Sequence, residues 1–304
     1  MGNIIVSIII ATFKRKETLI RSIESVVNQT YEYIELIVVD DNVLPEWNDL
    51  VEKIVFSFSK SFIKNRRIKY IKNNLSHGPG GARNCGILSA TGQYISFLDD
   101  DDLFLPNKVK KQVEQMEISK GDFSVTNSLM FNDSNKLVTK TNRIKTEHLD
   151  STALLRYHIM NNITNPNTMM FRTDFIKKIG GFENIDIGEE YFLIEKAIIN
   201  NGKYVYVDRY DVKCYIHLSN KSSLSVGAKK IEGEQKLFKH KKSFFKILKR
   251  KEQKYVIVRH HVVLLYTYWR MHNIFLSFWH LLICFLVSPI NTIKVVRYSK
   301  GVQQ

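Results

Sequence analysis

Apolar and polar residues alternate in blocks over the first hundred positions, and the blocks have the lengths of strands and helices. Four runs rich in apolar residues predict strands; they are Ile4–Ala11, Ile34–Val39, Ile68–Ile71 and Tyr94–Leu98. The first two are apolar at all but one position, as expected of strands that are buried in the sheet. Apolar residues at helical spacing predict helices over residues 16–29 and 82–90. Strands and helices that alternate in this way form a mainly parallel central sheet flanked by helices. The sequence therefore predicts the α/β class.

The pattern continues to about residue 225 with further elements. The predicted helices cover residues 107–119, 148–160 and 191–200, and the predicted strands lie within 122–142, 168–171, 204–207 and 212–216. No internal repeat appears. We expect one domain over residues 1–225, in two halves that meet near residue 105, and a basic, aromatic helical extension over residues 226–304.

The extension begins with a predicted helix in which apolar positions share one face among many lysines; these positions are Leu237, Phe244 and Leu248. Two apolar, aromatic stretches follow, Tyr255–Trp269 and Ile274–Val287. A membrane span needs about 20 apolar residues, and shorter runs are more often interfacial or core helices. We therefore expect residues 228–290 to lie on an anionic membrane surface rather than to span the membrane.

Charge and cysteine content narrow the choice of partners. The 304 residues carry a formal net charge of +15, which implies an anionic partner. Residues 228–254 contain much of this excess, but no recognised nucleic-acid module accompanies it, so we expect no nucleic acid. Cys85, Cys214 and Cys284 lie far apart and form no zinc motif. We interpret them as reduced thiols of a cytoplasmic protein.

The strongest chemical signal is the run of four carboxylates Asp99–Asp102, directly after the fourth predicted strand. Adjacent carboxylates repel one another, and a bound cation relieves this repulsion. Asp99 and Asp101, at alternate positions, could both face one divalent ion that bridges two phosphate groups. The alternative is a solvated acidic turn in which Asp102 caps the helix that begins near Pro106.

Other polar residues follow the ends of the predicted parallel strands. Thr12, Asp40 and Asp99 stand at three such ends and should converge, since ligands of these sheets bind beyond the carboxyl ends of the strands. The Asp40 carboxylate could accept a hydrogen bond from a nucleotide base, or it could simply terminate the strand. The turn from Gly78 to Asn84 allows close approach of a ligand, and its Arg83 offers a fork of donors.

Two further candidates come later in the chain. Glu189 and Glu190 stand at the start of a predicted helix, where a carboxylate is either a favourable partner of the helix dipole or a general base. His217 follows a predicted strand, and it could ligate a metal, contact a diphosphate or be structural. Each of these residues alone is weak evidence for chemistry.

Taken in order, the motifs resemble the family-2 inverting glycosyltransferases with the GT-A fold. The matching segments cover roughly residues 4–217; they are Val6–Phe13, Ser25–Tyr31, Glu35–Asp41, Ala82–Asn84, Gly92–Asp102, Gly180–Phe182 and Glu189–Glu190. The resemblance implies transfer from a nucleotide diphosphosugar, usually a UDP-sugar, with Mn²⁺ or Mg²⁺. The half before residue 105 would then bind the nucleotide and the half after it the acceptor.

The resemblance also implies roles for individual residues. The donor would contact Thr12, Phe13, Asp40, Arg83, Asp99 and Asp100. The metal would be held by Asp101 and Asp99, with His217 as a further candidate. Glu190 falls where the family usually has the catalytic Asp of a Glu-Asp pair, so Glu189 and Asp186 remain alternative bases.

The sequence leaves three candidate functions. The first is a glycosyltransferase at the inner face of the cell membrane that adds a sugar to a glycan or lipid-linked acceptor in cell-surface polysaccharide synthesis. The second is a sugar-phosphate nucleotidyltransferase, which usually needs a glycine- and arginine-rich first loop that residues 12–16 do not supply. The third is a catalytically inactive binding protein that has kept the fold.

Overall fold

The structure is a computed structural model that describes residues 3–62, 65–141, 149–163, 165–185, 188–216 and 227–303, with side chains through Arg297. A single mixed sheet with the strand order β3-β2-β1-β4-β8-β6-β9-β5 runs through the domain, and β7 pairs with β6. The predicted boundary near residue 225 lies outside the described residues, so the division into domains stays a prediction.

The first half of the sheet is parallel, as the sequence predicts. Its strands are β1 (Val6–Thr12), β2 (Ile34–Asp40), β3 (Arg67–Lys72) and β4 (Tyr94–Asp99). Three helices connect them: α1 (Glu17–Val27), α2 (Pro45–Ser57) and α3 (Pro79–Ser89). The sequence analysis missed α2, although Pro45 at its first turn and the buried positions Val51, Ile54 and Val55 are typical of an amphipathic helix.

The second half of the sheet is largely antiparallel. Its strands are β5 (Leu103–Phe104), β6 (Phe123–Asn132), β7 (Leu137–Thr141), β8 (Met169–Arg172) and β9 (Tyr204–Ile216). Its helices are α4 (Lys108–Ser119), α5 (Ser151–Asn161), α6 (Thr173–Lys178) and α7 (Glu189–Ile199). Only the β6–β9 pair is parallel here, and β9 is one strand where the sequence predicts two.

Two apolar cores cover the two faces of the sheet. Ile8 and Ile10 of β1 pack with α1 and α2 on one face, whereas Ile9 packs with α3 on the other. Successive side chains of a strand point to opposite faces, which explains why β1 is apolar at every position from Ile8 to Ile10. These cores fix the carboxyl ends of the parallel strands.

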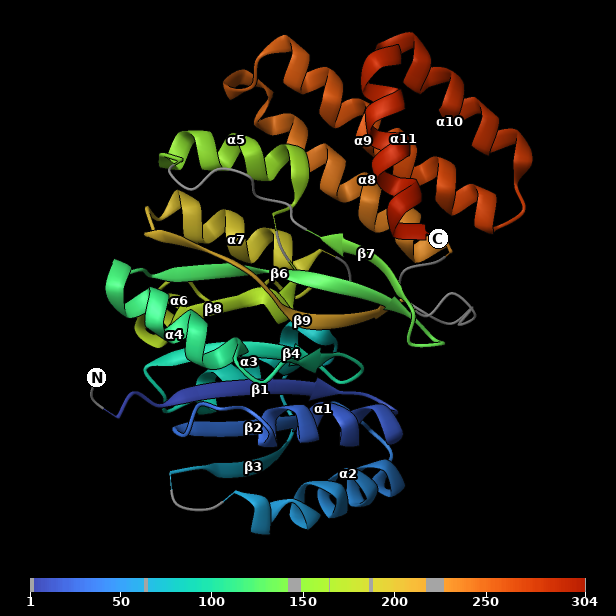
Figure 1. The fold of residues 1–304 in the computed structure, drawn as a ribbon. Helices are drawn as coiled ribbons and strands as arrows, with labels where there is room; N and C mark the ends of the chain where they lie inside the picture. Colours follow the sequence, from blue (N-terminus) through green and yellow to red (C-terminus); the bar gives the residue numbers. More distant parts are fainter. Residues whose placement is uncertain are drawn as a thin grey trace.

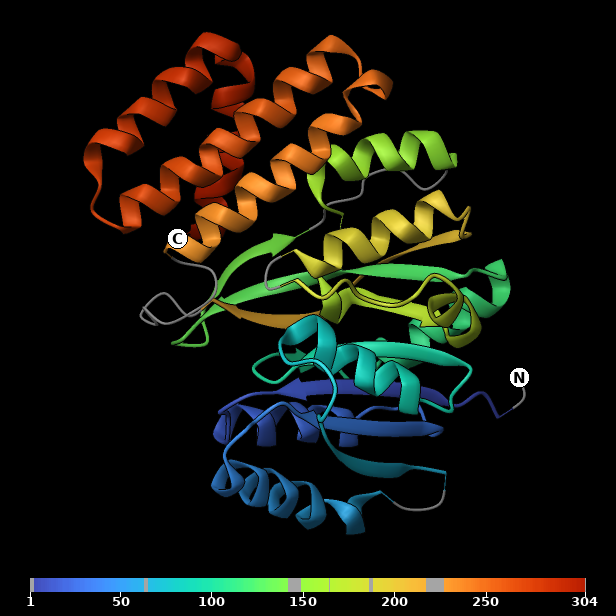
Figure 2. The same cartoon turned by 180° about the vertical axis from the view of Figure 1, so that it is seen from behind.

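Four helices form the extension at one end of the molecule (Figures 1 and 2); they are α8 (Ala228–Ser243), α9 (Arg250–Arg270), α10 (Ile274–Val287) and α11 (Pro289–Gln303). The prediction of one helical face for Leu237, Phe244 and Leu248 is wrong, because α8 ends at Ser243 and a 3-10 turn (Phe245–Ile247) follows. Leu248 instead packs with Ile159 of α5. Within the described residues, no helix has both the length and the apolar composition needed to cross a membrane.

Candidate active site

Three parallel strands end side by side at the edge of the sheet where the sequence places its polar residues. Thr12 pairs with Asp40 across β1 and β2, and Ala11 pairs with Asp99 across β1 and β4. The predicted convergence of these strand ends is confirmed. A cavity of about 630 Å³ opens beyond them, and Thr12, Phe13, Arg83, Asp99, Asp100 and Asp101 are among the residues that line it.

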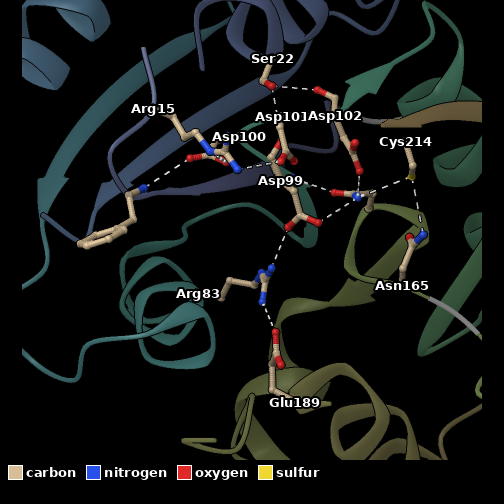
Figure 3. A network of polar contacts seen from close by, with 12 residues as sticks. Arg15, Ser22, Arg83, Asp99, Asp100, Asp101, Asp102, Asn165, Glu189 and Cys214 are labelled. Carbon is tan, nitrogen blue, oxygen red and sulfur yellow. Dashed lines mark hydrogen bonds and ion pairs between the residues drawn. The ribbon is translucent and has the colours of Figure 1, made fainter. Parts of the chain in front are cut away.

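The middle of the acidic run faces the loop that follows β1 (Figure 3). The Asp100 carboxylate accepts hydrogen bonds from the Thr12 hydroxyl (2.7 Å) and the Phe13 backbone N–H (3.3 Å). Nη2 of Arg15 lies 3.3 Å from Oδ2 of Asp101 and forms an ion pair with it. Burial and the neighbouring Asp101 raise the pKa of Asp100 to about 7. The run is therefore partly desolvated and crowded, not a solvated acidic turn.

Asp99 and Asp102 form a second part of the acidic run, held together by Asn167. The Asn167 side-chain amide donates to Asp99 (3.0 Å) and to Asp102 (2.5 Å). Asp102 also accepts from the Tyr215 backbone N–H (2.8 Å). The expectation that Asp102 caps the next helix is wrong, because this buried side chain joins β4 to β9 and the N-cap position of α4 is Asn107. Nothing in the sequence around Asn167 indicated its role.

Arg83 connects the acidic run to the helix that carries the candidate base. Its guanidinium donates to Asp99 and to Glu189, both at 2.7 Å, and the side chain is 9% exposed (Figure 3). Burial disfavours the Arg83 cation, but the two carboxylates outweigh burial and raise its pKa above the usual range. One buried cation therefore connects the acidic run to Glu189, which lies 106 positions after Arg83 in the chain.

The structure separates the two candidate bases at the start of α7. Glu189 is buried and paired with Arg83, whereas Glu190 is half-buried and makes no ion pair with the described residues. Burial and the adjacent Glu189 raise the pKa of Glu190 to about 7. Glu190 can therefore exchange a proton near neutral pH.

Asp41 borders the cavity, whereas the predicted donor ligand Asp40 does not. Asp40 is fully buried and accepts hydrogen bonds from Asn42, Asn48 and Tyr70, so its expected contact with a nucleotide base is not available in this structure. The sequence analysis singled out Asp40, because the alternation of side chains at the end of β2 cannot be read from the sequence alone.

The glycine-rich turn leads into α3 as predicted, but its glycines serve packing within the protein. A Cβ atom at Gly81 would lie 2.0 Å from the Ser76 carbonyl oxygen, and one at Gly80 would lie 2.4 Å from that of Glu183. The Asp41 carboxylate accepts from the Gly78 backbone N–H at 2.8 Å and fixes the start of the turn. The turn thereby sets where Arg83 enters the site.

Two of the predicted site residues, the candidate metal ligand His217 and the alternative base Asp186, lie outside the described residues. Within the described part of the chain, no three His, Cys, Asp or Glu side chains form a ready-made metal site. The cavity also contains two cations that the sequence analysis did not single out, Arg15 and Lys229.

The order of these motifs and the geometry of the site correspond to a known family. Residues 7–180, more than half of the chain, match the family described as Glycosyl transferase family 2. The chain belongs to this family.

Among curated relatives, the chain is 42% identical over 123 residues to the Escherichia coli UDP-Glc:alpha-D-GlcNAc-diphosphoundecaprenol beta-1,3-glucosyltransferase WfaP, a match over 40% of this chain and 45% of WfaP. It is 29% identical over 214 residues to the uncharacterized glycosyltransferase MJ1057 of Methanocaldococcus jannaschii, over 70% and 71% of the two chains.

Solved structures establish the fold of this family-2 member as GT-A. S. aureus TarS 1-349 in complex with UDP-GlcNAc superposes with a TM-score of 0.60 at 17% identity, over 90% of this chain and 89% of TarS. The mannosyltransferase PcManGT from Pyrobaculum calidifontis, in complex with GDP-Man and Mn²⁺, gives 0.59 at 14% identity, over 98% and 79%. At these identities the likeness concerns the fold alone.

Proposed function

We propose that the protein is an inverting glycosyltransferase that moves a sugar from a nucleotide diphosphosugar, preferentially a UDP-sugar, to a hydroxyl group. The observation that supports the proposal is the chain of contacts Asp99–Arg83–Glu189, which connects two residues of the cavity lining to the helix that begins with Glu189 and Glu190. Family membership supports sugar transfer. The UDP-GlcNAc complex of TarS and the UDP-Glc named for WfaP support a UDP-sugar as donor.

The donor would lie in the cavity beyond β1, β2 and β4. Thr12, Phe13 and Asp41 border one part of it and would contact the nucleoside. Arg15 and Lys229 border the same cavity and offer positive charge to the diphosphate. Exposed Phe13 supplies an apolar surface next to these polar groups.

The residues of the acidic run fit Mn²⁺ or Mg²⁺. Asp99, Asp100 and Asp101 all border the cavity, and carboxylate oxygens are the hard donors that these ions prefer. Asp101 and Asp99 would hold the ion. Two protein ligands would leave room for oxygen atoms of the donor diphosphate. Such an ion supplies charge stabilisation to the departing nucleoside diphosphate.

Glu190 would act as the general base of the transfer. Its carboxylate takes the proton of the acceptor hydroxyl while that oxygen forms a bond to the anomeric carbon. The bond from the anomeric carbon to the diphosphate breaks on the opposite face, and its electron pair leaves with the nucleoside diphosphate. Attack opposite to the leaving group inverts the anomeric configuration. Arg83 holds Glu189 and so fixes the start of the helix that carries Glu190.

The acceptor that we propose is a glycan or lipid-linked saccharide of cell-surface polysaccharide synthesis. WfaP and the E. coli relative WfgD, which is 36% identical over 140 residues, are both named for an acceptor linked to diphosphoundecaprenol. A Rhizobium meliloti relative, 26% identical over 209 residues, is named for succinoglycan biosynthesis. The matches to WfaP and WfgD span 45% and 51% of those proteins, so the acceptor belongs to the proposal.

Substitution of the two neighbouring glutamates tests the assignment of the base. We expect Glu190→Gln to lower kcat by about 10²–10⁴-fold, because an amide cannot accept the proton, and to leave the affinity for UDP within about twofold. Glu189→Gln removes a charge from the same turn and is the matched control. Unlike Glu190→Gln, it should weaken UDP binding, since Arg83, which borders the cavity, loses one of the two carboxylates that hold its guanidinium in place. Calorimetric titration with UDP and Mn²⁺, and release of UDP from a panel of UDP-sugars, measure the two effects.

Other outcomes would contradict Glu190 as the base or sugar transfer as the function. Full activity of Glu190→Gln together with an inactive Glu189→Gln would make Glu189 the base. Pyrophosphate release from a nucleoside triphosphate and a sugar phosphate would instead identify a nucleotidyltransferase. Binding of UDP-sugars without transfer or hydrolysis by the unmodified protein would identify a binding protein. The product's anomeric configuration, determined by NMR, tests inversion.

A further inference from the structure

Helix α10 exposes an unusual number of large apolar side chains. Within the part of the chain that the structure describes, half of the exposed large apolar side chains fall between residues 269 and 293. Phe275, Phe278 and Leu286 are 78%, 61% and 76% exposed. Both views place α10 at the outer edge of the helical extension (Figures 1 and 2). Contiguous apolar surface of this kind marks an interaction site.

The most deeply buried residues of α10, Ser277 and Cys284, are small, so the larger apolar side chains of this helix are less buried or exposed. Ser277 is buried and donates to the Leu265 carbonyl oxygen (3.1 Å). Cys284 is buried and donates to that of Val258 (3.7 Å). The outward positions, spaced three or four residues apart, contain Phe, Trp and Leu. Burial against the protein therefore does not explain the large apolar side chains on the outward face of this helix.

The apolar stripe continues beyond α10 and has basic residues at its ends. Ile290 and Ile293 of α11 are exposed as well. Arg270 precedes α10, and Lys294 and Arg297 follow it; all three are exposed. Helix α10 itself contains no Asp, Glu, Lys or Arg. A long apolar face with cations at its ends matches the interface of an anionic bilayer, where acyl chains lie beneath negative headgroups.

We propose that the outward face of α10, continued by Ile290 and Ile293, inserts into the headgroup region of an anionic membrane with the helix parallel to its plane. At 14 residues, α10 is too short to span a bilayer. A second copy of the chain is disfavoured as the occupant, because each copy carries a net charge of +15. The proposal goes beyond the catalytic function and does not depend on it.

The proposed inserted face includes fewer residues than the region 228–290, which the sequence analysis expects to lie on the membrane surface. Helix α8 packs against the protein: Leu237 is buried, and the buried Lys241 ammonium donates to Asn162 (2.7 Å). The lysines that remain exposed on α8 would add long-range attraction to negative headgroups without contacting the acyl chains. For a transferase with a lipid-linked acceptor, this attachment would keep the active site near the membrane.

Vesicle binding by the full-length chain tests the inserted face. We expect co-sedimentation with vesicles of equimolar phosphatidylcholine and phosphatidylglycerol, and less with phosphatidylcholine alone. The triple substitution Phe275→Ser, Trp279→Ser and Leu286→Ser should weaken binding to the anionic vesicles by about tenfold or more. The matched control changes equally exposed residues elsewhere, Phe56→Ser, Leu88→Ser and Ile118→Ser, and should bind as the unmodified protein does.

Two further measurements separate the possible outcomes. Thermal unfolding of both triple variants should match that of the unmodified protein, since the substituted side chains are exposed. Light scattering should show a monomer for all of them. Unchanged sedimentation of the α10 variant, or equal loss in the control variant, would overturn the proposal. A stable dimer that the α10 substitutions dissociate, without vesicle binding, would assign the face to self-association instead.

Discussion

At the scale of single residues, Arg83 contributes more than its sequence context indicates. The turn before it suggested a donor to a bound nucleotide, and the structure places its guanidinium between Asp99 and Glu189. The planar fork of arginine can donate to two carboxylates at once, which the point charge of lysine cannot do equally well. Arg83 also borders the cavity, so it lies between the proposed donor and the proposed base.

Removal of this cation should destabilise the protein strongly. Arg83→Met leaves the buried Glu189 carboxylate without its cation and removes the cation beside Asp99, and we expect a loss of about 3–5 kcal/mol in the free energy of unfolding. Arg67→Met is the matched control, since Arg67 also pairs with a carboxylate, Glu35, but is 48% exposed. The control should lose less than about 1 kcal/mol. Urea denaturation measures both; similar losses would show that the Arg83 pairs contribute little.

At the scale of secondary-structure elements, Glu35 joins three strands of the parallel half-sheet. It lies on β2, is fully buried, accepts from Ser7 of β1 (2.5 Å) and pairs with Lys69 of β3 (2.7 Å). Burial disfavours its ionised form, but hydrogen bonds from Lys69, Ser7 and Thr91 outweigh burial and lower its pKa to about 2.

This shift predicts a specific loss of stability in acid. A carboxyl group whose pKa is lower in the folded chain stabilises the fold above its ordinary pKa of about 4.5, and the contribution disappears as the pH falls toward about 2. We expect the loss to be on the order of 2 kcal/mol, because Lys69 is partly solvated. Glu35→Gln should be less stable at pH 7 and should lose less between pH 5 and pH 2. Denaturation curves across this range measure the difference, and parallel acid profiles would contradict it.

At the scale of the whole molecule, the helical extension is attached to the rest of the protein through α5 and α7. Arg156 of α5 pairs bidentately with Glu252 of α9: Nη2 donates to Oε1 at 2.6 Å and Nε donates to Oε2 at 3.3 Å. His240 of α8 contacts Glu195 of α7 at 2.7 Å. The orientation of the proposed membrane face relative to the cavity depends on these polar contacts and on the apolar contacts of Leu248 with Ile159.

The Arg156–Glu252 pair should contribute measurably to this attachment. A double-mutant cycle with Arg156→Ala and Glu252→Ala should give a coupling energy of about 1–2 kcal/mol, since the pair is bidentate and its side chains are only 24% and 14% exposed. The exposed pair Lys236–Glu232 on α8 provides the control cycle, with an expected coupling below about 0.5 kcal/mol. Equal coupling in the two cycles would mean that the Arg156–Glu252 pair contributes no more to the attachment than an exposed ion pair does.

The sequence alone predicted the parallel half-sheet and the convergence of its strand ends. Continuous β-branched runs such as Ile8–Ile10 require burial on both faces, and the carboxyl ends of parallel strands necessarily share one edge. The helix α10 was likewise predicted within its observed bounds, because an uninterrupted apolar run is a local property. These features depend on residues close together in the chain.

Only the tertiary structure decided which side chains of that edge can meet a ligand. Asp40 and Asp41 are chemically equal in the sequence, yet Asn48 and Tyr70 occupy the first and leave the second on the cavity. Glu189 and Glu190 are equal as well, until Arg83, 106 residues earlier, pairs with one of them. Such choices arise from contacts between distant segments, and their energies depend on burial, which no local pattern of residues specifies.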